Sequence, residues 1–185
     1  MAERTCPVWV GYLLASPVRK LYHNPVKILS PYIKEGMKVI DVGSAMGFFS
    51  IPAAKMVGKS GKVICVDLQK EMLEKLEKRA RKAKVLAQIE LHQCIEKSLE
   101  IDSLKNQIDF ALAFAVLHEM NDVSKVFNEV NKALKPNSKM LIAEPGGHVT
   151  KDAFELTMNS ALKNNFKVIG KPLINGSQTA LLQKI

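Results

Sequence analysis

The most informative stretch is Asp41-Val42-Gly43-Ser44-Ala45-Met46-Gly47, which joins an apolar run to a helical one. Gly43 permits a tight turn, and Gly47 lets a ligand approach the backbone where the helix starts. The free N–H groups at that helix start favour a carboxylate or a phosphate. Asp67 ends the next apolar run, about 24 residues after Gly43, where a carboxylate can accept hydrogen bonds from both hydroxyls of a ribose. The glycine turn and the acid together predict a pocket for a nucleoside ligand.

A second group of polar side chains follows the fourth apolar run, which ends at Leu117. His118 and Glu119 come next, and there they offer a general base or a hydrogen bond to a substrate. The alternative for both is an ordinary polar loop, or a cap for the helix that follows. Glu144, just after the fifth apolar run, and His148 are further candidates for the same site.

Strands and helices alternate along the chain, and they must bring these two groups together. The expected strands cover residues 38–42, 62–67, 88–92, 108–115 and 139–143. One helical stretch follows the glycines and ends near Val57. Three more are expected at 71–84, 122–134 and 152–164. This alternation predicts an α/β fold with a mostly parallel sheet. Ligands of such sheets bind at the carboxyl ends of the strands, where both groups fall.

The end of the chain departs from this alternation. Two late strands are expected at about 166–172 and 179–185, separated by a turn signal at Asn175-Gly176-Ser177. A parallel pair would need a crossover of a dozen or more residues. The last two strands should therefore pair as an antiparallel hairpin.

The composition limits the class of protein. The chain has 185 residues, of which 47% are hydrophobic, enough for one domain with one core. The 27 Lys and Arg residues against 18 Asp and Glu give a net charge of +9, which permits an anionic partner without establishing one. The longest apolar run, 110–117, is far too short to span a membrane.

Cysteine usage indicates a reducing, cytoplasmic compartment and no metal. Cys6, Cys65 and Cys94 cannot all pair, and none has the spacing of zinc ligands. Cys65 lies inside an expected strand and should pack in the core. Cys94 is expected to be a ligand-lining or structural thiol, with a reactive thiol as the alternative.

Basic residues are concentrated on the helix expected at 71–84: Lys75, Lys78, Arg79, Arg81, Lys82 and Lys84. Glutamates at 71, 74 and 77 intersperse them and can form near-neighbour helix pairs. We therefore expect a solvated face. Nucleic-acid binding is the disfavoured alternative, because no aromatic residues interleave with these charges.

Residues 1–35 differ from the rest of the single domain, 1–185. Prolines at 17, 25 and 31 interrupt any long helix there, and Trp9, Tyr12, Leu13 and Leu14 are large and apolar. We expect an arm packed over the sheet. The alternatives are a lid over the substrate or a peripheral contact with a membrane surface.

The spacing of the glycines indicates which class of nucleoside ligand the pocket would bind. A dinucleotide fingerprint needs glycines at 43, 45 and 48, but this chain has Ala45 and Phe48, with its second glycine at 47. The pattern resembles the class I S-adenosylmethionine-dependent methyltransferases, whose first motif runs acid-x-Gly-x-Gly-x-Gly. The resemblance covers residues 36–185, includes the terminal hairpin, and extends to the sequences at 109–114 and 134–138. It is closest to the small-molecule branch, including quinone-biosynthesis-type enzymes.

This resemblance implies a Rossmann-like, seven-stranded sheet in the order 3-2-1-4-5-7-6, with S-adenosylmethionine as cofactor. The residues it assigns to the cofactor are Asp41, Gly43, Ser44, Ala45, Gly47, Asp67, Leu68, Cys94, Ile95, Ala113 and Phe114. Two positions depart from the family pattern: Ala45 replaces its middle glycine, and Cys94 stands where an acid usually binds the adenine amino group.

The resemblance further implies methyl transfer to a small, apolar acceptor by in-line displacement. His118 or Glu119 is the expected base, needed when the acceptor nucleophile carries a proton. An RNA methyltransferase and a non-catalytic S-adenosylmethionine-binding module remain the alternatives. The sequence does not indicate an oligomeric state.

Overall fold

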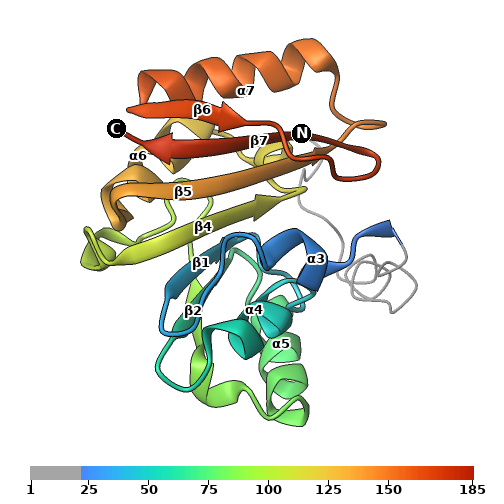
Figure 1. Cartoon of the computed structure of the whole chain (residues 1–185), viewed down its shortest axis with the longest axis vertical. Coiled ribbons are helices and arrows are strands. Elements are labelled where there is room, and N and C mark those ends of the chain that lie inside the picture. The colour runs from blue at the N-terminus through green and yellow to red at the C-terminus, as the bar shows by residue number, and fades with distance from the viewer. Residues whose placement is uncertain (1–21) are drawn as a thin grey trace.

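A seven-stranded sheet in the order β3-β2-β1-β4-β5-β7-β6 runs through the computed structural model, which describes residues 22–185 (Figure 1). Its strands are β1 (Lys38–Val42), β2 (Lys62–Asp67), β3 (Ile89–Gln93), β4 (Ile108–Phe114), β5 (Leu134–Pro145), β6 (Phe166–Gly170) and β7 (Ser177–Lys184). The first five strands are parallel, and β7 is antiparallel to both β5 and β6. The predicted order and the predicted terminal hairpin are both confirmed.

Helices cover both faces of this sheet, and its central strands are therefore buried on both sides. One face packs against α3 (Pro25–Leu29), α4 (Ser50–Val57) and α5 (Lys70–Lys82). The other packs against α6 (Val123–Ala133) and α7 (Lys151–Lys163). Alternation along β1 divides the two cores: Val39 belongs to the first and Ile40 to the second.

Three short 3-10 turns complete the described elements: η1 (Leu86–Gln88), η2 (Asp102–Leu104) and η3 (Leu117–Glu119). No helix within residues 22–185 combines the length and the apolar character needed to cross a membrane.

Residues 24–33 form part of the core. Asn24 caps α3 by accepting hydrogen bonds from the N–H groups of Val26 and Lys27. Leu29 is fully buried, and the Tyr32 ring stacks on Phe110 with centroids 5.4 Å apart. The residues on which the lid prediction rests, Trp9 to Leu14, lie outside the described part of the chain, so that prediction stays open.

Strand β5 begins five residues earlier than predicted. Leu134 already pairs with Ile108, and the register then shifts so that Lys139 pairs with Phe110. The intervening residues form an irregularity in which Asn137 has a φ of 62°. Because Pro136 and Asn137 are typical turn residues, the sequence conceals this continuation.

Candidate active site

The loop between β1 and α4 has an unusual backbone. Gly43, Ala45 and Gly47 have φ values of 73°, 44° and 78°. A Cβ atom at Gly43 would overlap the Val116 side chain, and one at Gly47 would lie 2.8 Å from Leu76 Cγ. Packing against the protein itself therefore requires glycine at both positions. The predicted approach of a ligand to the backbone at Gly47 remains a prediction beside this packing role.

Hydrogen bonds hold this loop, residues 43–47, from several sides. The N–H groups of Gly43 and Ser44 donate to the Val66 carbonyl at 2.9 and 3.0 Å. The Ala45 N–H donates to Asp67 Oδ2 at 2.7 Å, and the Gln69 N–H donates to Asp67 Oδ1 at 2.9 Å. Burial raises the pKa of Asp67, although these amides oppose the shift. Asp67 therefore shapes the glycine loop as well as standing at the predicted ribose position.

Asp41 anchors the helix that follows the loop. Its Oδ2 accepts a hydrogen bond from Ser50 Oγ at 2.5 Å, and both residues are buried. Ser50 is the first residue of α4. The predicted cofactor contact of Asp41 remains a prediction, but its position already fixes β1 to α4.

The loop fits a polar ligand of the predicted kind. Ser44 Oγ is buried and has no hydrogen-bond partner within the described residues, while the Ser44 residue is only 4% exposed. A buried hydroxyl without a partner is costly, so a ligand that bonds to it would gain affinity. The two oxygens of the Asp67 carboxylate can accept further hydrogen bonds beyond those from its backbone amide donors. Ser44 and Asp67 are therefore the residues that would hold S-adenosylmethionine here.

The other residues assigned to the cofactor surround the same edge of the sheet. The Cys94 N–H donates to the Asp67 carbonyl at 3.0 Å, and Ile95 is 52% exposed beside it. Leu68 is partly buried against the core. Ala113 and Phe114 are buried at the end of β4. The structure thus gathers them near Asp67 and β4, while their roles remain predictions.

The thiol of Cys94 is not an activated nucleophile. Burial, followed by the charge of Asp67, raises the pKa of Cys94 to about 11. Cys65 is completely buried within β2, as predicted, and burial raises the pKa of its thiol strongly. Both cysteines are unpaired. The reactive-thiol alternative for Cys94 therefore has no support.

The second group of candidates is organised by Glu144, at the end of β5. Glu144 is 1% exposed, and its Oε1 accepts hydrogen bonds from the Val116 and Leu117 N–H groups at 3.1 and 3.0 Å. Its Oε2 binds His118 Nδ1. One buried carboxylate therefore fixes both the turn that carries His118 and the orientation of the imidazole.

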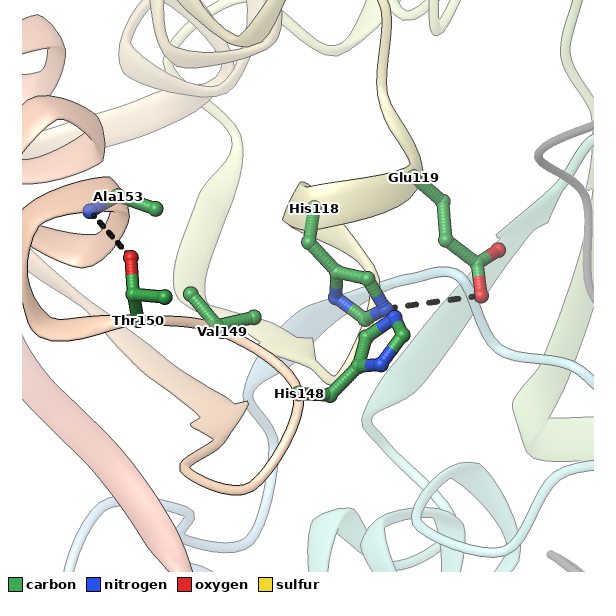
Figure 2. Close-up of a pocket in the computed structure, with 6 residues that line it drawn as sticks. All are labelled: His118, Glu119, His148, Val149, Thr150 and Ala153. Atoms are coloured by element: carbon green, nitrogen blue, oxygen red, sulfur yellow. Dashed lines mark hydrogen bonds and ion pairs between the residues drawn. The ribbon is translucent and has the colours of Figure 1, made fainter.

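An open pocket of about 460 Å³ lies in front of this imidazole. Its lining residues are His118, Glu119, His148, Val149, Thr150 and Ala153 (Figure 2). The His118 and His148 rings meet edge to face with centroids 5.0 Å apart. Glu119 Oε1 lies 3.9 Å from His118 Nε2. The two residues predicted as candidate bases thus share one pocket with His148.

The environment of His118 favours its charged form. The hydrogen bond with Glu144 raises the pKa of His118 most, burial opposes it, and the charges of Glu144 and Glu119 add to the rise. When the ring is neutral, a proton on Nδ1 satisfies Glu144 and leaves the Nε2 lone pair free to accept a proton. The pair is therefore arranged to act as a base at Nε2.

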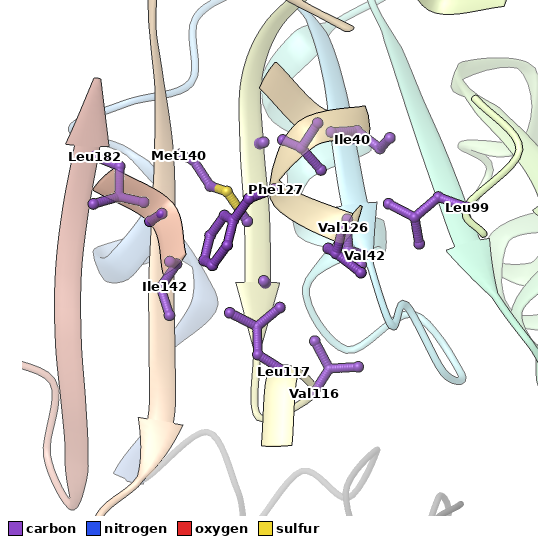
Figure 3. Packing of buried hydrophobic residues seen from close by; sticks show 14 of the residues in the cluster. Ile40, Val42, Leu99, Val116, Leu117, Val126, Phe127, Met140, Ile142 and Leu182 are labelled. Atoms are coloured by element: carbon purple, nitrogen blue, oxygen red, sulfur yellow. The ribbon is translucent and has the colours of Figure 1, made fainter. Parts of the chain in front are cut away.

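The glycine loop packs against the residue that precedes the His118 turn. Val116, which excludes a side chain at Gly43, precedes the His118 turn directly. Val116 and Leu117 are both buried in the core that α6 covers (Figure 3). Val116 thus links the packing of the loop to the position of the His118 turn.

Sequence reasoning undervalued two residues. The sequence marks Glu144 only as a further candidate, because nothing in it shows that this carboxylate bonds to two amides and an imidazole. Arg79 was placed on a solvated face, but it is only partly exposed and donates to the Met46 carbonyl at 2.5 Å. Its spacing of three residues from the buried Leu76 was the signal for this position. Within residues 22–185, no three His, Cys, Asp or Glu side chains gather as metal ligands.

Comparison with known proteins identifies the family. The family model described as "Methyltransferase domain" matches residues 33–180. The chain belongs to the methyltransferase family. This methyltransferase also has the predicted fold: it matches the crystal structure of an S-adenosylmethionine-dependent methyltransferase from Aquifex aeolicus with a TM-score of 0.85 and 23% identity. That match covers 97% of this chain and 98% of the other.

Curated relatives agree with this assignment. The methyltransferase is 24% identical to the ubiquinone/menaquinone biosynthesis C-methyltransferase UbiE of Pasteurella multocida, over 80% of this chain and 54% of that protein. It is 26% identical to the ribosomal protein L11 methyltransferase of Dictyoglomus thermophilum, over 78% of this chain and 43% of that protein. The chain therefore spans about half the length of these relatives. The predicted class I methyltransferase is confirmed in family and fold, which together imply S-adenosylmethionine as cofactor.

Proposed function

We propose that this methyltransferase transfers a methyl group from S-adenosylmethionine to a small molecule whose nucleophilic atom carries a proton, with His118 as the base. The observation that carries the proposal is the bond between His118 Nδ1 and the buried Glu144, which leaves Nε2 of this pocket-lining residue available to accept a proton. A protonated acceptor needs such a base, whereas an acceptor with a free lone pair does not.

The cofactor supplies a methyl group already activated on a positively charged sulfur, so its binding and alignment are the main tasks of the protein. The 43–47 loop would hold it through Ser44 Oγ and the Asp67 carboxylate. Leu68, Cys94, Ile95, Ala113 and Phe114 would line the rest of its site, as the resemblance implies. In-line geometry then requires the acceptor to lie within reach of both the methyl group of the cofactor and His118 Nε2.

The acceptor proton passes to His118 Nε2 as the methyl group arrives. The resulting imidazolium keeps its bond to Glu144, and Glu119 lies 3.9 Å from Nε2. Two carboxylates therefore stabilise the charge that develops on the ring. Glu144 does not touch the acceptor in this scheme, so it acts as a positioning residue.

The size and lining of the pocket support a small acceptor. A cavity of about 460 Å³ lies within the range of small-molecule sites. Val149 and Ala153 offer apolar contact, and Thr150 and His148 offer polar contact. The likeness to the C-methyltransferase UbiE also supports a small molecule. The unpaired Cys65 and Cys94 support a reducing compartment such as the cytoplasm.

The test is to incubate the protein with a metabolite extract and S-adenosylmethionine that carries an isotopically labelled methyl group, and to identify labelled products by mass spectrometry. We expect a labelled small molecule with the wild-type protein and a loss of roughly 10²–10⁴-fold in His118→Ala. A parallel incubation with total RNA tests the alternative acceptor. Label in RNA alone, or equal labelling by both proteins, would reject the proposal.

A further inference from the structure

The surroundings of the 43–47 loop contain a charged residue that the methyl-transfer scheme does not use. Arg79, on α5, donates through Nη1 to the Met46 carbonyl. This contact crosses from the last turn of α5 to a loop residue 33 positions earlier. The guanidinium of Arg79 is partly removed from water where it reaches that carbonyl, and this burial lowers the pKa of Arg79.

Arg79 and Asp67 act on the loop with opposite polarity. Asp67 accepts from the Ala45 N–H at 2.7 Å, and Arg79 donates to the carbonyl of the next residue, Met46. The two charged groups thus hold peptide groups on either side of the Ala45–Met46 bond. Ala45 is the non-glycine residue of this loop with a positive φ, 44°, a conformation that needs support from its surroundings.

The helix that carries Arg79 also limits the loop by packing. Leu76, one turn earlier on α5, occupies the space where a side chain at Gly47 would lie. Leu76 is fully buried, so α5 presents a fixed apolar contact and a fixed donor to adjacent parts of the loop. Helix α5 therefore contacts the loop at two adjacent residues, by packing at Gly47 and by a hydrogen bond at Met46.

We propose that Arg79 is a positioning residue for cofactor binding, because it holds the 43–47 loop in its ligand-ready conformation through a peptide group that Asp67 does not bind. The inference rests on the proposed function, in which this loop binds S-adenosylmethionine. Preorganisation of this kind raises affinity without any contact between Arg79 and the ligand.

The test compares Arg79→Met, which keeps the length of the side chain but loses the donor, with Arg81→Met. Arg81 is two residues further along α5, is exposed, and pairs with Glu77 across one turn at 2.7 Å. It is therefore a matched control for the loss of one arginine from this helix. Arg79→Lys keeps the charge and a single donor.

The first readout is amide hydrogen exchange of the cofactor-free protein, measured by NMR at Ala45 and Gly47. We expect these amides to exchange roughly tenfold faster in Arg79→Met, at an intermediate rate in Arg79→Lys, and at the wild-type rate in Arg81→Met. The second readout is the Kd of S-adenosylhomocysteine by calorimetry, for which we expect the same order and a loss of roughly tenfold.

Wild-type exchange and affinity in Arg79→Met, or equal changes in both methionine variants, would overturn the proposal. If Arg79→Met does not fold, Arg79→Lys provides the test. Faster amide exchange in the loop together with weaker S-adenosylhomocysteine binding supports the clamp, by which we mean the hold of Arg79 on the 43–47 loop. Wild-type exchange rates and a wild-type Kd reject it. Absence of binding by the wild-type protein would instead refute the proposed function, while the exchange data would still test the clamp.

Discussion

The glycine loop and the histidine pocket lie at the same edge of the sheet, but they are built in different ways. Several supports hold the loop: backbone hydrogen bonds, the charged side chains of Asp67 and Arg79, and the packing of Val116 and Leu76. In the pocket, the single carboxylate of Glu144 binds two backbone amides of the His118 turn and the His118 imidazole. The conformation of the loop depends on packing and hydrogen bonds, whereas the chemistry of the pocket depends on the charge of His118.

This difference separates the two tasks of the proposed reaction. Cofactor binding needs a loop of defined conformation, so sequence changes there should alter the stability of the loop and the affinity for the cofactor. A proton transfer needs a group whose charge changes, so changes in the pocket should alter pH dependence more than stability. Variants in the two regions should therefore give different signatures.

The largest expected effect is the loss of stability in Gly43→Ala. A Cβ atom there overlaps Val116, and the φ of 73° disfavours any L-residue. Strain and overpacking together should lower the free energy of unfolding by roughly 2–4 kcal/mol, measured by urea denaturation. Gly147→Ala is the matched control, because nothing lies within 4 Å of a Cβ at that position. Equal stabilities of the two variants would show that packing does not define the loop.

The next largest effect is expected for Asp67→Ala, measured as the Kd of S-adenosylmethionine by calorimetry. Loss of the carboxylate removes its contact with the ligand and its hold on the Ala45 N–H, which should weaken binding by about 2–3 kcal/mol. Because burial raises the pKa of Asp67, wild-type affinity should start to fall, on acidification, at a higher pH than for an ordinary carboxyl group. The exposed Asp102→Ala serves as control. Unchanged affinity in a folded Asp67→Ala protein would remove Asp67 from the site.

In the pocket, the expected effect is a shift in the pKa of His118, followed by NMR titration. The hydrogen bond with Glu144 is the main cause of the raised value, and Glu119 contributes least. Glu144→Gln should therefore lower the pKa of His118 toward that of a free histidine, and Glu119→Gln should lower it less. The opposite order would mean that Glu119, not Glu144, controls the ring.

The smallest effect concerns Cys94, which lies beside the loop without a reactive role. Its raised pKa of about 11 leaves the thiol protonated at pH 8. Alkylation by iodoacetamide at pH 8 should therefore be slow at Cys94 in the native protein and fast after denaturation, as quantified by peptide mass spectrometry. Rapid native modification would mean that the thiol is open to solvent and activated.

The fold could be predicted because its signals are local. Apolar runs such as 38–42 and 62–67, each followed by helical composition, define the parallel order, and the Asn175-Gly176-Ser177 turn defines the hairpin. The early start of β5 could not be predicted, because Pro136 and Asn137 give the same local signal in a turn and in an irregular strand.

The two regions of the site also differ in how far local sequence signals predict them. The loop carries a spacing that the sequence displays, so Gly43, Gly47 and Asp67 could be singled out from local residues. The bond between His118 and Glu144 joins residues 26 positions apart, one in the turn after β4 and the other at the end of β5, and only the pairing of these neighbouring strands brings them together. Arg79 was concealed for the same reason, since its partner Met46 lies on a different element.

The central claim is that His118, held by Glu144, takes the acceptor proton during methyl transfer. The most direct measurement is the pH dependence of kcat/KM with the acceptor identified from the extract, for the wild-type protein and His118→Ala. The raised pKa keeps Nε2 protonated at low pH, so the wild-type rate should rise with pH to a plateau, with a midpoint above the ordinary histidine value and equal to that of His118 in the NMR titration. His118→Ala should be slower by roughly 10²–10⁴-fold and lack this rise. The same pH profile in both proteins would contradict the account.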